Sequence, residues 1–283
     1  MGITAGIVVI NHLSPIKNRL TAYDQRRMVR IEKYFSVNQN GFSIRCKLYC
    51  TDIRHINSVV LFCHGFSGNK DNRMAETVAK RIQKRHNDIA LLIFDWPCHG
   101  DDASNELRLA DCSAYLNNVI EYVKTKFHTD KIYVSATSFG GYLTLKYIAE
   151  NGNPFIRVAF RCPAVNMYDT LTCNILTEED LSTIRKGKPI SVGFDRKVKI
   201  NNDFLNELKD NDITILDYRS YSNQLMIVHG TKDEIVSYDV VRGFAEKNGI
   251  ALYTVEGADH RFTNPNKMDE AITSILSHLF QMN

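Results

Sequence analysis

Three side chains that together could carry out nucleophilic catalysis occur in the order Ser138, Asp233, His260 along the 283-residue chain. A serine hydroxyl attacks a carbonyl carbon when a general base removes its proton, and an acid must hold that base in place. Each of the three follows a short apolar run typical of a buried strand. Because active sites of open parallel sheets lie at the carboxyl ends of the strands, we expect the three side chains to meet at one edge of a sheet. These residue types in this order predict acyl transfer.

Ser138 lies where a strand pattern changes to a helix pattern. The run 132–136 suits a buried strand, and the apolar spacing becomes helical after Gly140. A tight turn at this point forces a positive φ on the serine and presses the residues two before and two after it against the neighbouring backbone, so both must be small. Ala136 and Gly140 meet this requirement, although Ala136 adds one methyl group to the more usual glycine. The pattern predicts an exposed nucleophile; an ordinary turn serine is the alternative that the other segments must exclude.

His260 is the histidine in the position that a base needs. It follows the predicted strand 251–255 and comes last in the order. Three other histidines, His64, His99 and His229, also lie beside strand ends. We expect these three to hydrogen-bond loop backbone.

Asp233 is the predicted acid, because it lies in the loop past the carboxyl end of the predicted strand 224–228. It could also simply stabilise its own turn, as Asp often does in loops. Glu234 and Asp259 are alternative acids. Asp259 is the less favoured, because it is adjacent to His260 in sequence and would have to bend back to reach Nδ1.

Two backbone N–H groups are predicted to bind the oxyanion of a tetrahedral intermediate. One belongs to Phe139 at the start of the helix after Ser138, where N–H groups are unpaired and the helix dipole favours an anion. The other belongs to Phe66 in the loop after the predicted strand 58–63, where Gly65 lets the backbone approach the substrate closely. A plain glycine turn is the alternative for this loop. The stretch 95–101 is expected to brace the neighbouring loops and to carry no chemistry.

Strand and helix patterns alternate along most of the chain. Residues 28–49 alternate in polarity and break at Asn40-Gly41, which predicts an antiparallel hairpin. Further predicted strands are 58–63, 89–94, 132–136, 158–162, 224–228 and 251–255, and predicted helices are 73–85, 110–127, a segment ending at 150, 238–247 and 266–280. This order predicts an α/β fold with a mostly parallel central sheet and helices on both faces.

The alternation lapses between residues 163 and 222. This stretch is richer in charge, with a helix start at 177–180 and a hairpin near 192–200. A structureless loop of this length is improbable inside a domain, so we predict an inserted lid. The predicted organisation is an N-terminal arm at 1–23, a core at 24–162 and 223–283, and a lid at 163–222.

Composition excludes several classes of partner. The formal net charge is +3 with dispersed Lys and Arg, which argues against nucleic acid and against an anionic membrane. The apolar run at 1–10 follows no basic residue and makes a poor signal peptide. Seven scattered cysteines favour reduced thiols and the cytoplasm. Cys63-His64 and Cys98-His99 lack the paired spacing of a zinc site, so we expect no metal and no cofactor.

Taken together, five segments resemble the serine α/β-hydrolases, and among them most closely the cinnamoyl (feruloyl) esterase group of small bacterial hydrolases. The segments are 64–68, 95–100, the turn around Ser138, 229–233 and 257–262. The resemblance implies an α/β-hydrolase fold and hydrolysis of small carboxylic esters, aromatic or short-chain, with the insertion over the acyl group. A homodimer is left open.

Three other functions fit the same residues. The ending Gly140-Gly141-Tyr142 also resembles the catalytic domains of prolyl-oligopeptidase-like peptidases, which usually carry a large extra domain. An acyl thioesterase would use the same three side chains. A catalytically silent binding protein of this fold is the alternative from outside enzymes.

Overall fold

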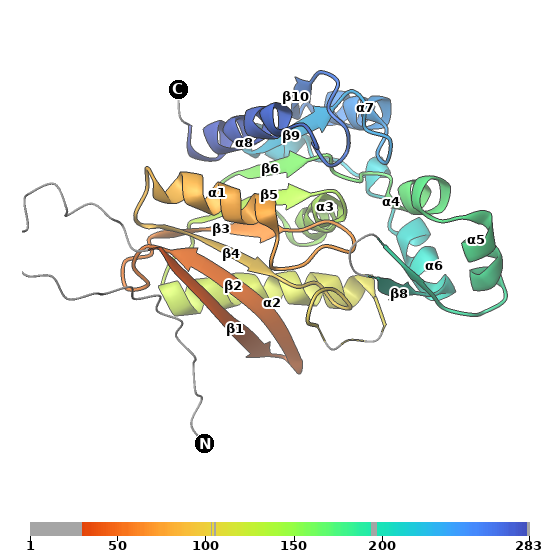
Figure 1. The fold of residues 1–283 in the computed structure, drawn as a ribbon, viewed down its shortest axis with the longest axis horizontal. Helices are drawn as coiled ribbons and strands as arrows, with labels where there is room; N and C mark the ends of the chain where they lie inside the picture. Colours follow the sequence, from red (N-terminus) through yellow and green to blue (C-terminus); the bar gives the residue numbers. More distant parts are fainter. Residues whose placement is uncertain (1–29, 103, 105, 194–196, 282–283) are drawn as a thin grey trace, which may run out of the picture.

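The computed structural model describes residues 30–102, 104, 106–193 and 197–281 (Figure 1). An eight-stranded sheet forms its centre, with the strands β1 (Ile31–Gln39), β2 (Phe42–Cys50), β3 (Ser58–Cys63), β4 (Ile89–Phe94), β5 (Ile132–Thr137), β6 (Val158–Arg161), β9 (Leu225–Gly230) and β10 (Ala251–Val255). The spatial order is β1-β2-β4-β3-β5-β6-β9-β10. β2 alone points opposite to the other strands, so its pairs with β1 and β4 are antiparallel and the remaining pairs are parallel. The prediction of a mostly parallel sheet is confirmed.

The predicted hairpin is the first feature of this sheet. β1 and β2 pair along their whole length, and the pair nearest the turn is Gln39 with Phe42. The turn residues Asn40 and Gly41 have φ values of 51° and 81°. Asn and Gly tolerate these left-handed conformations, which is why the dipeptide favours a two-residue hairpin turn. Residues 28–29 of the predicted hairpin lie outside the described residues.

Helices cover both faces of the sheet. They are α1 (Arg73–Gln83), α2 (Leu109–Phe127), α3 (Phe139–Asn151), α7 (Tyr238–Asn248) and α8 (Pro265–Phe280). α1 and α8 pack on one face, and α2, α3 and α7 pack on the other. Strands covered on both faces must be apolar throughout, and β3 and β4 are buried at every position. The predicted element boundaries agree with these bounds to within about two residues, which is the usual uncertainty of helix and strand ends.

The segment between β6 and β9 holds short elements of its own. They are α4 (Met167–Asp169), the π-helix η1 (Thr170–Ile175), α5 (Glu178–Arg185), β7 (Ile190–Val192), β8 (Val198–Ile200), α6 (Asn202–Asp210), and the 3₁₀ helices η2 (Ile213–Ile215) and η3 (Arg219–Gln224). The predicted helix start is confirmed by a capping box between Thr177 and Asp180. The predicted hairpin is confirmed as the antiparallel pair β7 and β8. Figure 1 shows α5, α6 and β8 beyond the arrowheads of the parallel strands, at the edge where the site residues are expected.

Contacts of α6 attach this segment to the core near the predicted nucleophile. The ring of Phe204 on α6 lies with its centroid 6.3 Å from that of Phe139, the residue after Ser138. The Glu207 carboxylate accepts a 2.7 Å hydrogen bond from the N–H of Leu109 at the start of α2. The segment is therefore anchored close to the predicted nucleophile, and its role as a lid stays a prediction.

Two further predictions concern the chain outside this core. The predicted N-terminal arm at 1–23 lies outside the described residues. Among the residues that are described, no helix is both long enough and apolar enough to cross a membrane.

Candidate active site

Ser138 occupies a strained turn between β5 and α3. Its φ and ψ are 51° and −117°, a conformation that costs a non-glycine residue on the order of 1–3 kcal/mol. Neighbouring backbone holds it there: the Ser138 N–H donates to the carbonyl of Arg161 at 3.0 Å, and its own carbonyl accepts from the N–H groups of Gly141 and Ala164 at 2.9 and 3.1 Å. These bonds fix the turn from the neighbouring strand β6 as well as from α3.

Glycines let the backbone close around this turn. A Cβ on Gly140 would lie 2.3 Å from the carbonyl oxygen of Cys63 and 2.6 Å from that of His64. A Cβ on Gly65 would lie 3.2 Å from the Cβ of Ser138. The requirement for a small residue at position 140 is therefore confirmed by the packing, while the close approach of Gly65 to a substrate stays a prediction.

Gly140→Ala should destabilise the fold, because the new methyl group would collide with backbone that cannot rotate away. We expect a loss of about 2–3 kcal/mol in the free energy of unfolding, which for a chain of this size lowers Tm by roughly 5–10 °C. Gly243→Ala is the matched control, since Gly243 lies in α7 with nothing within 4 Å of the added carbon. Thermal unfolding followed by circular dichroism compares the two, and equal Tm values would contradict the packing argument.

The three side chains singled out by the sequence form one hydrogen-bonded series. Nε2 of His260 lies 3.1 Å from Oγ of Ser138, and Nδ1 of His260 lies 2.8 Å from Oδ2 of Asp233 and 3.0 Å from Oδ1. The carboxylate of Asp233 is fully buried, while the His260 side chain keeps 12% of its surface exposed. A base that is hydrogen-bonded to a hydroxyl on one side and to a buried carboxylate on the other is the arrangement that can activate serine.

The alternative acids lie elsewhere. Asp259 binds Thr263 instead, accepting from its backbone N–H at 2.8 Å and from its hydroxyl at 2.6 Å. Glu234 accepts a long 3.3 Å bond from the backbone N–H of His260 and does not reach the ring. Asp233 also stabilises its own turn, since Oδ1 accepts from the N–H groups of Ile235 and Val236 at 2.9 and 2.7 Å. Asp233 therefore does both things that the sequence suggests: its carboxylate holds His260, and it stabilises its own turn.

Burial and hydrogen bonding act in opposite directions on Asp233. Burial raises the pKa of its carboxyl group, but the hydrogen bonds from His229 and His260 and the charge of His260 outweigh burial and hold the pKa well below its usual range. The group is therefore ionised at neutral pH. An ionised acceptor at Nδ1 keeps the proton on that nitrogen of His260 and leaves Nε2 free to accept the serine proton.

The loop after β3 is fixed around the carbonyl of Gly65. This oxygen accepts from Nδ1 of His64 at 2.8 Å and from the N–H of Gly68 at 3.0 Å, so the plane of the peptide that carries the Phe66 N–H cannot turn freely. Nε2 of His64 accepts from the N–H of Trp96 at 3.4 Å. Burial, with a smaller effect of His99, lowers the pKa of His64 to about 3, so the ring stays neutral and keeps its single hydrogen for Gly65.

The two predicted oxyanion donors, the N–H groups of Phe66 and Phe139, belong to residues that lie side by side in space. Phe139 is the first residue of α3, so its N–H has no partner within the helix. The rings of Phe66 and Phe139 meet edge to face with centroids 5.7 Å apart. The role of both N–H groups as donors to substrate remains a proposal.

The loop after β4 braces its surroundings, as the sequence predicts. The buried carboxylate of Asp95 accepts from the backbone N–H of Lys70 at 2.6 Å and from that of Asp101 at 2.9 Å. Gly100, with φ 57°, lies so close that a Cβ there would be 2.3 Å from Asp95. The side chain of Asp95 thereby connects the loop after β3 with the loop after β4.

The strand-end histidines hydrogen-bond loop carbonyls as expected, and His229 does more. Its Nε2 lies 3.0 Å from the carbonyl oxygen of Val236 and also 3.2 Å from Oδ2 of Asp233. Sequence reasoning missed this second contact, although His229 and Asp233 are only four residues apart.

The sequence analysis also missed two residues at the end of β6 that lie near Asp233 and His260. Cys162 follows β6, and its Sγ lies within 4.8 Å of the Asp233 carboxylate. Arg161, which is 8% exposed, donates from Nη1 to the carbonyl of His260 at 2.7 Å. Nothing in the sequence places this strand end beside the loops that follow β9 and β10, so no local signal could have identified either residue.

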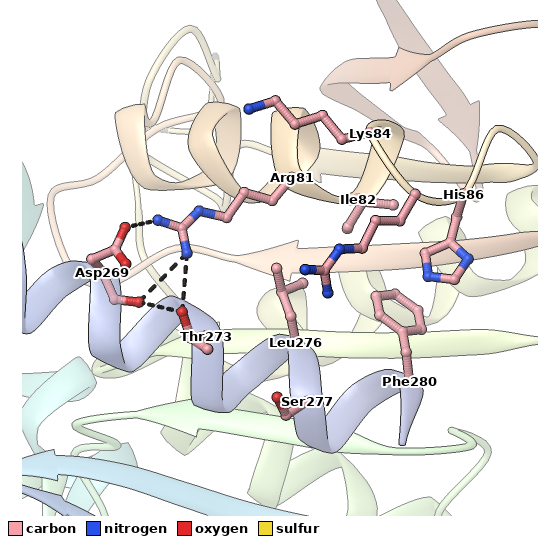
Figure 2. A pocket seen from close by; sticks show the side chains of 10 residues that line it. Arg81, Ile82, Lys84, His86, Asp269, Thr273, Leu276, Ser277 and Phe280 are labelled. Carbon is pink, nitrogen blue, oxygen red and sulfur yellow. Dashed lines mark hydrogen bonds and ion pairs between the residues drawn. The ribbon is translucent and has the colours of Figure 1, made fainter. Parts of the chain in front are cut away.

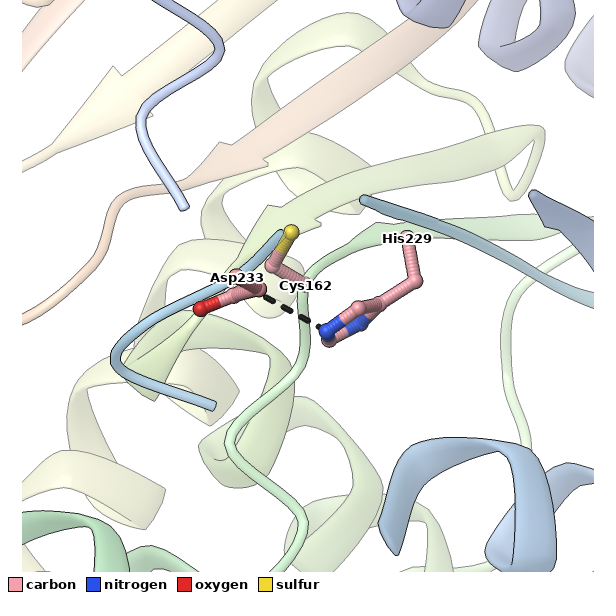
Figure 3. A group of neighbouring side chains, drawn as sticks. All are labelled: Cys162, His229 and Asp233. Carbon is pink, nitrogen blue, oxygen red and sulfur yellow. Dashed lines mark ion pairs between the residues drawn. The ribbon is translucent and has the colours of Figure 1, made fainter. Parts of the chain in front are cut away.

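One cluster among the described residues contains atoms of the kinds that bind metals. One atom each from Cys162, His229 and Asp233 lie within 4.8 Å of one another, and Figure 3 shows the three side chains meeting. We assign these atoms to the surroundings of the Asp233 carboxylate, because its Oδ2 already lies 2.8 Å from Nδ1 of His260 and 3.2 Å from Nε2 of His229.

A cavity of about 360 Å³ lies away from these residues, between α1 and α8. Figure 2 shows Arg81 bound there to Asp269 and Thr273 across the gap, with the rings of His86 and Phe280 at one end. None of Ser138, Asp233 and His260 lines it. We therefore place the candidate active site at the serine and not at this cavity.

Comparison with known proteins gives a match to one family model over part of the chain. Residues 54–190 match the family model Hydrolase_4, described as serine aminopeptidase, S33. None of the curated proteins matches the sequence.

Solved structures match over nearly their whole length. A hydrolase from Agrobacterium vitis S4, named as putative in its title, is 15% identical, with a TM-score of 0.69, covering 89% of this chain and 99% of that one. Est1E from Butyrivibrio proteoclasticus with ferulic acid bound is 17% identical, with a TM-score of 0.69, covering 87% and 99%. Mouse α/β hydrolase domain-containing protein 10 is 15% identical, with a TM-score of 0.64, covering 89% and 100%. At these identities the likeness establishes the fold.

Proposed function

We propose that this chain, which has the α/β-hydrolase fold, cleaves carboxylic esters through an acyl-enzyme on Ser138. Its family match and its structural neighbours indicate a serine hydrolase, and the proposal starts from that premise. The observation that carries the proposal is the continuous series from Oγ of Ser138 through His260 to the buried carboxylate of Asp233. A serine, a base and an ionised acid in this geometry suit acyl transfer to the hydroxyl.

The proposed reaction has two halves. In the first, Nε2 of His260 takes the proton of Ser138 while Oγ bonds to the ester carbonyl carbon, and the N–H groups of Phe66 and Phe139 stabilise the oxyanion. The intermediate collapses when the bond to the alcohol oxygen breaks and His260 gives that oxygen its proton. In the second half, water loses a proton to His260 and attacks the acyl carbon, and Oγ leaves with the proton returned.

The acyl specificity is proposed to be aromatic or short-chain. The likeness to Est1E, whose structure contains ferulic acid, supports the aromatic reading. The position of Phe204 beside Phe139 supports a lid formed by residues 163–222, because it puts the insertion next to the nucleophile. A small ester would then enter between this segment and the loop that holds Phe66.

A peptidase is the second candidate, because the matching family model is described as a serine aminopeptidase. Kinetics with ester, anilide and thioester substrates separates the candidates. We expect kcat/KM to be highest for p-nitrophenyl butyrate or methyl ferulate and at least about 100-fold lower for an aminoacyl p-nitroanilide. An acyl thioester is the third substrate. Faster turnover of the anilide or the thioester than of either ester would contradict the proposal, and Ser138→Ala provides the blank for every substrate.

A further inference from the structure

The Asp233 carboxylate has two sides that are held by different parts of the chain. Its Oδ1 accepts from backbone N–H groups of its own loop, at Ile235 and Val236. Its Oδ2 faces His260 at 2.8 Å and has a further donor in Nε2 of His229 at 3.2 Å. The side chains of His229 and Asp233 are both completely buried, so no water competes for these contacts.

The hydrogen on His229 can be placed from its neighbours. Nε2 lies between two acceptors, the carbonyl oxygen of Val236 at 3.0 Å and Oδ2 of Asp233, so it must carry a proton. Nδ1 is buried and has no hydrogen-bond partner in the described structure. All the polar contact of this ring is therefore directed at the Asp233 loop: it holds the carbonyl of Val236 and one oxygen of the carboxylate at once.

Cys162 completes the same side of the carboxylate. Burial, followed by the charge of Asp233, raises the pKa of its thiol well above the usual value, so the sulfur stays protonated, within 4.8 Å of the carboxylate. Figure 3 shows the three side chains converging from β9, the loop after it and the end of β6. A thiol is a weak donor, so the stronger of the two restraints is His229.

We infer that His229 is a positioning residue of the proposed reaction: its Nε2–H fixes the rotation of the Asp233 carboxylate and moderates the charge that this carboxylate presents to His260. The inference rests on the proposed function. Without His229, Oδ2 would keep only His260 and the thiol of Cys162, and the carboxylate could turn about its Cβ–Cγ bond. The base would then be less often aligned with Ser138.

The charge argument gives a sign that can be measured. A carboxylate with one donor fewer stabilises the imidazolium form of His260 more strongly, so the acidic limb of the pH profile of kcat/KM should move to higher pH. The other charged or titratable groups that face this pair are Arg161, which is buried and interacts with Asp233, and the neighbours Glu234 and Asp259. None of them is changed by substituting His229.

The experiment compares two substitutions. His229→Phe keeps an aromatic ring and removes the donor, and His229→Gln keeps an N–H near the position of Nε2. For His229→Phe we expect kcat on p-nitrophenyl butyrate, per active site titrated with a fluorophosphonate, to fall about tenfold, the cost of one hydrogen bond to a charged group. KM should stay within about twofold, and the acidic limb should rise by roughly half a pH unit. His229→Gln should restore kcat to within about threefold of the original protein.

The matched control is His278→Phe. His278 is half-buried, whereas His229 is fully buried, but it also binds a backbone carbonyl through Nε2, that of Gln224 at 3.1 Å. It lies on α8 and contacts the residue just before β9, away from the carboxyl ends of the strands. This variant should leave kcat and the pH profile unchanged. His229→Asn, whose side chain is too short to reach Asp233, replaces His229→Phe if the larger ring prevents folding.

The outcomes separate the inference from the proposed function. If the unsubstituted protein neither turns over esters nor reacts with the fluorophosphonate, the proposed function fails. If it is active and His229→Phe shows unchanged kcat per titrated site and an unchanged pH profile, the inference fails. A variant that only loses titratable sites or Tm, with normal kcat at the remaining sites, also overturns it, because His229 would then act on stability alone.

Discussion

Replacing Ser138 by alanine is expected to lower kcat on a short p-nitrophenyl ester by about 10⁴-fold or more. The substitution removes Oγ, the atom that lies 3.1 Å from Nε2 of His260, so no acyl-enzyme can form. Losses of this size follow the removal of a nucleophile that works as a unit with its base. The fold should persist, since the bonds that hold the turn come from the backbone of residue 138.

Ser135→Ala is the matched control for this prediction. Ser135 is three residues earlier on β5 and is 1% exposed, so its substitution tests the cost of losing a buried hydroxyl on the same strand. We expect its activity to stay within a few fold of the original. Steady-state kinetics with both purified variants, each checked by circular dichroism, gives the comparison. Full activity of Ser138→Ala would remove the basis of the mechanism.

Replacing Asp233 by asparagine should lower kcat by about 10³–10⁴-fold with little change in structure. The amide nitrogen of Asn can donate to Nδ1 of His260, which moves the ring hydrogen to Nε2 and prevents that atom from taking the serine proton. The loss should appear in kcat more than in KM, because Asp233 is buried behind His260 and does not face the substrate side of the ring.

Two isosteric substitutions decide between the acids that the sequence leaves open. Asp259→Asn and Glu234→Gln should each retain activity to within about threefold, because Asp259 binds Thr263 and Glu234 reaches only the backbone of His260. The same kinetic assay measures all three variants. A loss for Asp259→Asn or Glu234→Gln as large as that for Asp233→Asn would show that the acid is assigned wrongly.

The fold was predictable because its elements have strong local signals. β3 and β4 are short apolar runs bounded by polar residues, and α1 shows helical spacing with Asn72 as its N-cap. Asn40-Gly41 marks a hairpin turn through its tolerance of positive φ. Where signals are weak the prediction was coarse: inside the insertion the helix start at 177–180 and the hairpin near 192–200 have local signals, whereas the π-helix η1 has no sequence pattern that distinguishes it from an irregular turn.

Order and position relative to strand ends indicated the candidate site, but not its supporting contacts. Ser138, Asp233 and His260 each follow a strand of a parallel sheet, so topology alone brings their loops together. The choice of Asp233 over Glu234 needed side-chain directions that sequence does not contain. Arg161 ends β6 and Cys162 follows it, and β6 lies between β5 and β9 in the sheet, beside the strands whose loops carry Ser138 and Asp233. Their contacts with Asp233 and His260 are therefore products of the sheet.

Labelling with a fluorophosphonate, followed by mass spectrometry of the digested protein, tests the central claim most directly. The reagent bonds covalently to a serine only where a neighbouring base activates its hydroxyl. The account predicts one modified peptide, carrying the label on Ser138, and loss of that label in Ser138→Ala. An unmodified Ser138, or a label found on another serine of the active protein, would contradict it.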